Sequence, residues 1–134
     1  MECVFCKIIS GEIPSEKIYE DDDVIAFLDI SPINKGHTLI VPKKHAVDVL
    51  DAEPAMLEAL ITAAKRIAPA IMKGVGAQGF NIGINNGSAA GQIVMHLHLH
   101  IIPRFKNDGL KHWPGRKCCE EELKEVRESI ARFL

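Results

Sequence analysis

Two hydrophobic periods alternate along this chain. Five short runs, rich in β-branched or aromatic residues and separated by turn residues, predict strands at residues 18–19, 24–28, 37–41, 80–85 and 96–102. Most connections between these runs are too short for a helical crossover. The runs are therefore expected to pair as an antiparallel sheet.

The period changes to that of a helix between the third and fourth runs. Over residues 53–72, apolar side chains recur every three or four positions, which predicts one long amphipathic helix. We expect Asp51 as its N-cap and Gly74 as its end, and we expect Pro69 to kink or shorten its last turns. Strands, a long helix and further strands together predict an α+β fold, in which the helix covers one face of a five-stranded sheet.

We expect residues 1–105 to form the core and residues 106–134 to form a C-terminal extension. Residues 106–117 are polar and contain glycine, which predicts a loop, and residues 120–133 return to helical spacing. The chain is thus expected to be one domain followed by a loop and a helix.

Composition narrows the class of protein. With 134 residues, 47% of them hydrophobic and 25% charged, the chain is long enough for one globular core. Its net charge of −2 gives no broad positive field for a nucleic acid polymer. No apolar run approaches the roughly 20 residues of a membrane-spanning helix, and no secretory signal is visible. We expect a cytoplasmic protein that binds neither membranes nor nucleic acid polymers.

Three histidines alternate with apolar residues in the last predicted strand. Alternation places the apolar residues on one face and His96, His98 and His100 on the other. Packing explains this poorly, because valine or threonine would fill the face without ring nitrogens to satisfy. A single metal ion shared by all three is disfavoured, because His96 and His100 stand roughly 13 Å apart along a strand. We predict that His98 attacks phosphorus as a neutral imidazole, which requires an acceptor for the proton on its other nitrogen.

The four cysteines form two pairs. Cys3 and Cys6 supply half of the ligands of a tetrahedral zinc site, and free thiols or an occasional disulfide remain the alternatives. Cys118 and Cys119 are adjacent, and we expect them to be unbound thiols.

Taken together, these motifs resemble the histidine triad (HIT) family. The family motif His-φ-His-φ-His-φ-φ corresponds to residues 96–102, and further matching motifs lie at residues 5–14, 27–32, 36–37, 42–45 and 85–92. The resemblance implies a HIT-like fold with additional short N-terminal and C-terminal helices, and residues 1–105 as the HIT domain. It also implies an enzyme that cleaves purine nucleoside 5′-phosphoryl conjugates of AMP or GMP, such as phosphoramidates and acyl adenylates. The implied intermediate is a nucleotidyl-histidine.

The resemblance also assigns catalytic roles. It implies that His98 is the nucleophile, that His37 is its orienting partner, and that His100 and Gln92 lie near the α-phosphate. One departure concerns the leaving group. The phosphoramidases of the family have a serine after the Gly-Gln pair, whereas this chain has Ile93.

Substrate-binding residues follow from the same resemblance. Asp29 is implied to receive the ribose hydroxyls, although a carboxylate at this position also suits a turn cap. The loop that contains Asn85, Ser88 and Gly91 is a candidate phosphate cradle, because glycine lets backbone amides approach an anionic oxygen. The base pocket of the family corresponds to six apolar residues, for each of which a plain core position is the alternative: Val4, Phe5, Ile8, Phe27, Leu28 and Ile30.

A metal and a partner subunit are implied as well. The chain resembles bacterial and archaeal members whose Cys-x-x-Cys pair binds zinc with two histidines, which implies a structural zinc on Cys3, Cys6, His45 and His96 and no catalytic metal. The sheet of the family is shared between two subunits, so a two-fold homodimer is implied, with the long helix near the interface.

Other functions remain open beside this one. The leaving group can be a second nucleotide, which makes the protein a dinucleoside polyphosphate hydrolase. The chain can also be a nucleotide-binding regulatory protein with vestigial hydrolysis, or a redox or zinc-storage protein built around the cysteines.

Overall fold

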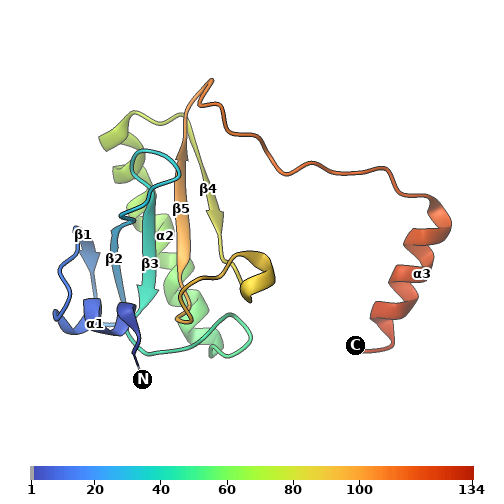
Figure 1. Cartoon of the computed structure of the whole chain (residues 1–134), viewed down its shortest axis with the longest axis horizontal. Coiled ribbons are helices and arrows are strands. Elements are labelled where there is room, and N and C mark those ends of the chain that lie inside the picture. The colour runs from blue at the N-terminus through green and yellow to red at the C-terminus, as the bar shows by residue number, and fades with distance from the viewer. Residues whose placement is uncertain (1) are drawn as a thin grey trace.

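A five-stranded antiparallel sheet organises the domain, as the computed structural model shows for residues 2–134 (Figure 1). The strand order is β1-β2-β3-β5-β4. The elements, in chain order, are α1 (Val4–Ser10), β1 (Lys17–Glu20), β2 (Val24–Leu28), β3 (Thr38–Pro42), α2 (Pro54–Val75), β4 (Gly79–Gly83), the short 3₁₀ helix η1 (Ser88–Ala90), β5 (Leu99–Arg104) and α3 (Glu120–Ala131). The α+β prediction is confirmed, with one long helix and short helices near both ends of the chain.

Both faces of β2 and β3 are covered, which explains why every residue of these two strands except Leu28 is buried. Alternate residues of β2 and β3 point to opposite sides of the sheet. One set joins the core under α2, and the other set packs against Phe5 of α1. In Figure 1, helix α2 lies behind the sheet, and it covers one face of the sheet, as predicted.

Two predicted details of α2, its N-cap and its end, are wrong, and the predicted shortening at Pro69 does not occur. The helix has Glu53 at its N-cap position, without a side-chain cap bond, because the Asp51 carboxylate accepts a bond from the amide of Val47 at 2.8 Å instead. It continues through Pro69 and Gly74 and ends at Val75, and the next residue, Gly76, has a φ of 73° that permits the left-handed turn. The proline lies on the exposed side, and the opposite face is buried along the helix, so packing offsets the lost backbone bond.

The histidine segment also departs from a regular strand. Pairing with β3 begins at Leu99, so β5 is shorter at its start than the predicted strand, and His96 and His98 precede it. In a regular ladder, the Pro42 carbonyl would accept a hydrogen bond from a backbone amide of the neighbouring strand. Here it accepts from the ring Nε2 of His96 at 2.8 Å instead. The predicted division of faces is nevertheless confirmed, because the three apolar residues of the segment lie in the α2 core: Leu97, Leu99 and Ile101.

The C-terminal part leaves the body of the domain. An extended segment carries α3 away from the sheet (Figure 1), and none of the α3 side chains is buried. The segment is anchored at its start, where Asp108 accepts bonds from Arg104 at 2.8 Å and from Asn34 at 3.0 Å. Within residues 2–134, no helix has the length and apolar character needed to cross a membrane.

Candidate functional site

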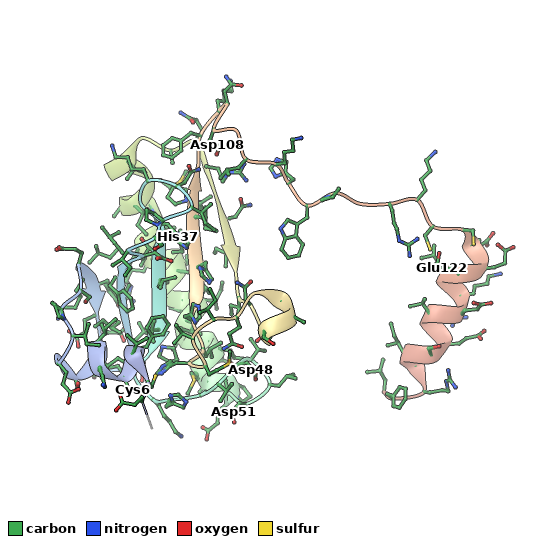
Figure 2. All side chains as sticks on the ribbon, in the orientation of Figure 1. Cys6, His37, Asp48, Asp51, Asp108 and Glu122 are labelled. Carbon is green, nitrogen blue, oxygen red and sulfur yellow. The ribbon has the colours of Figure 1, made fainter. Side chains whose placement is uncertain are left out.

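The triad histidines lie on the side of the sheet opposite α2, where His96 and His98 contact Phe5 of α1. Figure 2 shows Cys6 and His37 near opposite ends of β3. The triad histidines connect these two ends, since His96 contacts Cys6 and His100 contacts His37.

His98 has one ring nitrogen held and the other available. Its Nδ1 donates to the backbone carbonyl of His96 at 2.7 Å, which is the acceptor that a nucleophilic imidazole requires. The Nε2 therefore keeps its lone pair, and it has no hydrogen-bond partner among the described residues. The side chain is 7% exposed, and the Phe5 ring packs edge-on against it at a centroid distance of 5.0 Å.

His37 contacts His100, so an orienting effect on His98 would pass through His100, and the role of His37 as orienting partner remains a prediction. The amide of Ile33 donates to His37 Nδ1 at 3.0 Å, which places the proton of His37 on Nε2. His37 Nε2 then donates to His100 Nδ1 at 2.9 Å, which leaves the proton of His100 on Nε2. That Nε2 is buried without a partner. The chain of bonds thus ends in one unsatisfied N–H donor.

Burial keeps this histidine pair neutral. Burial, together with the neighbouring His98 and His37, lowers the pKa of His100 to about 4 against the opposing effect of Asp29. Burial likewise lowers the pKa of His37. Near pH 7 both rings are therefore neutral, as the hydrogen-bond chain requires.

Stability is expected to fall in acid because of this pKa shift. Between pH 6.5 and about 4 the unfolded chain binds a proton at His100 that the folded protein does not bind, so the free energy of unfolding decreases as the pH falls through that window. The expected loss from His100 is about 3 kcal/mol. Urea unfolding between pH 7 and pH 4 measures it.

The variant His100→Gln isolates this contribution, since glutamine keeps an acceptor and a donor but does not titrate. Its stability should depend less steeply on pH than that of the wild type. Equal slopes for the two proteins would contradict the assignment.

Gln92 is bound entirely to the main chain. Its Oε1 accepts from the amide of Gly87 at 2.8 Å, and its Nε2 donates to the carbonyls of Val47 and Val94 at 2.7 and 3.0 Å. The side chain is 3% exposed. It braces the loop before the triad, so its expected place beside the α-phosphate remains a prediction.

The rest of this loop lies open. Gly87 and Gly91 adopt φ values of 88° and 93°, which residues other than glycine rarely adopt. A Cβ on Gly91 would lie 3.6 Å from the side-chain amide nitrogen of Asn85. Ser88 opens η1 and is exposed. The predicted strand at 80–85 ends at Gly83, so Asn85 lies beyond β4 and shares one surface loop with Ser88 and Gly91. Their role as a phosphate cradle remains a prediction.

Asp29 caps a turn and also approaches the histidines. One carboxylate oxygen accepts from the amide of Ser31 at 2.8 Å, so the turn-cap alternative is present. The other oxygen lies 3.7 Å from His37 Nε2. The ribose contact of Asp29 remains a prediction.

The six predicted base-pocket residues divide into two groups. Phe5 and Phe27 are buried together, with ring centroids 5.6 Å apart, and belong to the core under α1. Ile8 packs beside them and is partly buried. The remaining three are exposed, and the last almost completely: Val4, Leu28 and Ile30.

Two cysteines and two histidines converge at the other end of the triad. The distances to His96 Nδ1 are 3.4 Å from Cys3 Sγ, 3.6 Å from Cys6 Sγ and 3.0 Å from His45 Nδ1. Ligands of a tetrahedral zinc ion with bonds of about 2.0 to 2.3 Å are separated by roughly 3.3 to 3.8 Å. His96 Nε2 donates to Pro42, so Nδ1 is left with its lone pair. The donor set fits zinc, and the two sulfur distances lie in this range, whereas the two histidine nitrogens are closer to each other than in such a site.

A cavity of about 570 Å³ adjoins His100, and the sequence did not reveal it. It lies between β4, β5 and the segment after Asp108, which contributes Lys111, His112 and Trp113. None of the described residues that line it is acidic. These three residues carry no local motif, so only the path of the chain could place them beside the triad.

Comparisons with known proteins identify a family, similar sequences and similar structures. The sequence profile described as "HIT domain" matches residues 10–107. Adenylylsulfatase HINT3 of Arabidopsis thaliana is 42% identical over 128 residues, which are 96% of this chain and 64% of that protein. The chain thus spans less than two thirds of that relative.

Two further relatives are matched over nearly their full length. Adenosine 5′-monophosphoramidase hnt1 of Schizosaccharomyces pombe is 38% identical over 98% of this chain and 97% of its own. The crystal structure of a Zn-bound histidine triad family protein from Mycobacterium smegmatis superposes with a TM-score of 0.79 at 42% identity, over 99% of this chain and 96% of that chain.

Proposed function

The chain belongs to the HIT domain family, and on that premise we propose that it is a nucleotide hydrolase or transferase acting on purine nucleoside 5′-phosphoryl conjugates through a nucleotidyl-histidine intermediate on His98. Two relatives named as an adenylylsulfatase and an adenosine 5′-monophosphoramidase support nucleotide hydrolysis as the class of reaction.

The tautomer of His98 carries the proposal. With the proton held on Nδ1 by the His96 carbonyl, the lone pair of Nε2 attacks the α-phosphorus. The P–N bond forms as the bond to the leaving group breaks, and the leaving group takes that electron pair. Water then attacks phosphorus and loses its proton to solvent, the electron pair of the breaking P–N bond returns to Nε2, and His98 regains its starting tautomer.

His100 supplies a donor for the phosphoryl group. Its Nε2–H is buried and unpaired, and its neutral state is maintained by a pKa of about 4. A phosphoryl oxygen would satisfy this donor, and the bond strengthens as negative charge develops in the transition state. His37 acts through His100 as a positioning residue, because it fixes which nitrogen carries the proton.

The remaining predicted residues fit roles in substrate binding. We assign the ribose hydroxyls to the Asp29 oxygen that the turn leaves free, and the phosphate to the loop with Asn85, Ser88 and Gly91. The exposed side chains of Val4, Leu28 and Ile30, together with Ile8 and the edge of the phenylalanine pair, are assigned to the purine.

The cavity beside His100 favours an anionic or aromatic leaving group. Its described lining includes Lys111 and Trp113 but no carboxylate, so a cationic amine gains no partner there. Ile93 is 89% exposed and offers no hydroxyl to a leaving nitrogen. Acyl adenylates are therefore preferred to phosphoramidates, and a dinucleoside polyphosphate is the second candidate.

Further proposals concern organisation. Residues 1–105 are the HIT domain and residues 106–134 its C-terminal extension. Zinc on Cys3, Cys6, His45 and His96 is proposed to have a structural role, and its thiolates favour a reducing, cytoplasmic location. A homodimer is proposed along β4, an edge strand on which Phe80 and Ile82 are 41% and 42% exposed.

The test is capture of the intermediate. The protein is mixed with an acyl adenylate, adenylyl sulfate, adenosine phosphoramidate or diadenosine tetraphosphate, quenched rapidly in alkali, and measured by intact-protein and peptide mass spectrometry. An AMP adduct on the peptide that contains His98 is expected, most abundant with the anionic leaving groups. Nucleotide binding without an adduct or turnover would instead support the regulatory alternative.

A further inference from the structure

His96 belongs to two sites at once. Its ring lies in the Cys3–Cys6–His45–His96 cluster, and its backbone carbonyl, 2.7 Å from His98 Nδ1, holds the proton of the proposed nucleophile. The residue is completely buried. Any shift of its ring therefore also moves the group that sets the tautomer of His98.

The backbone here has little support from the sheet. Pairing with β3 begins only at Leu99, so the His96 carbonyl is not held by a strand ladder. What holds the segment is the ring of His96, which donates to Pro42 at 2.8 Å, and the amide of Leu97, which donates to the Ala46 carbonyl at 2.7 Å. Ala46 directly follows His45, a second member of the cluster.

The two cysteines make a third connection. Phe5 lies between Cys3 and Cys6 in the sequence, and its ring contacts both His96, at a centroid distance of 6.0 Å, and His98, at 5.0 Å. The Cys3 sulfur also accepts from the amide of Cys6 at 3.4 Å, so it caps the helix that carries Phe5. All four members of the cluster are thus tied to the surroundings of His98.

We propose that a metal ion on this cluster positions the nucleophile as well as stabilising the fold. Binding holds His96 Nδ1 and His45 Nδ1 in place, and through Ala46, Leu97 and Phe5 it fixes the carbonyl that keeps the proton on His98 Nδ1. His96 is a positioning residue in this arrangement. The predicted effect on rate rests on the proposed function, whereas the predicted effect on the tautomer does not.

The experiment compares the zinc-loaded protein with the chelated protein. Histidine-labelled samples are studied by ¹⁵N NMR at pH 8, where neutral rings reveal their tautomers, and kcat and KM are measured on the same samples. In the loaded protein, His98 is expected to show a single tautomer with the proton on Nδ1. After chelation we expect mixed tautomers and a kcat about 10- to 100-fold lower, with KM changed less than about threefold.

Two cysteine pairs provide matched variants. Cys3→Ser with Cys6→Ser should reproduce the effect of chelation, and Cys118→Ser with Cys119→Ser should leave the NMR signals and kcat as in the wild type. Circular dichroism identifies a temperature at which each sample is folded. If the first double variant does not fold, His45→Asn and the chelated wild type replace it.

The outcomes separate the two proposals. An unchanged His98 tautomer in folded, metal-free protein overturns the positioning role, whatever the activity. Mixed tautomers with unchanged kcat would support the effect of the metal on the His98 tautomer but contradict His98 as the nucleophile. Mixed tautomers with a lower kcat support both.

Discussion

Replacing His98 with alanine is expected to lower turnover by about 10⁴-fold or more, because removal of a covalent nucleophile eliminates the reaction route rather than slowing one step. The AMP adduct should disappear at the same time. The measurement is single-turnover hydrolysis of the best substrate from the panel, together with mass spectrometry of the quenched protein.

Chemical rescue provides the control for this variant. His98→Gly leaves a space beside Phe5, which an added imidazole can enter and use to attack the same phosphorus. Activity that returns with the imidazole concentration would show that the site is intact apart from the missing ring. If His98→Ala turns over all four substrates at the wild-type rate, the nucleotidyl-histidine mechanism is wrong.

Removal of both N-terminal cysteines is expected to produce the largest loss of stability. Cys3→Ser with Cys6→Ser takes two of four ligands from the cluster, and a metal at 1,000 times its Kd contributes about 4 kcal/mol to the folded state. For a domain of this size the melting temperature should fall by roughly 10 to 20 °C. Differential scanning calorimetry and metal analysis of the purified protein measure both quantities.

The tail cysteines provide the matched comparison. Cys118 donates to Glu122 at 2.8 Å and lies far from the cluster in sequence. Among residues 2–134, it belongs to no group of three or more side chains that could hold a metal ion. Cys118→Ser with Cys119→Ser should therefore retain one zinc per chain and the wild-type melting temperature. Equal melting temperatures for both double variants would contradict the claim that a metal on this cluster stabilises the fold.

Local patterns predicted the elements because each depends on near neighbours. The apolar residues at 53–72 recur with the helical period, and α2 forms there. Alternation along the histidine segment correctly placed Leu97 and Leu99 in the core. Both results follow from backbone geometry that repeats every few residues, so no distant part of the chain was needed.

Element ends were predicted less well, since distant groups decide them. Asp51 suits an N-cap by residue type, but the Val47 amide is its partner. Pro69 disfavours a helix in isolation, yet the buried face of α2 keeps the helix continuous. The first histidines leave the strand because a ring, not an amide, meets the Pro42 carbonyl.

For the site, the sequence by itself determined which side chains are available, namely the alternating histidines, the Cys-x-x-Cys pair and the glycine-containing loop. Only the tertiary structure decided their partners. His37 meets His100 from 63 positions away, Gln92 is bound by the main chain, and the tail lines one side of a cavity beside the triad. A residue type specifies what a group can donate or accept, whereas the partner it finds depends on how the whole chain packs.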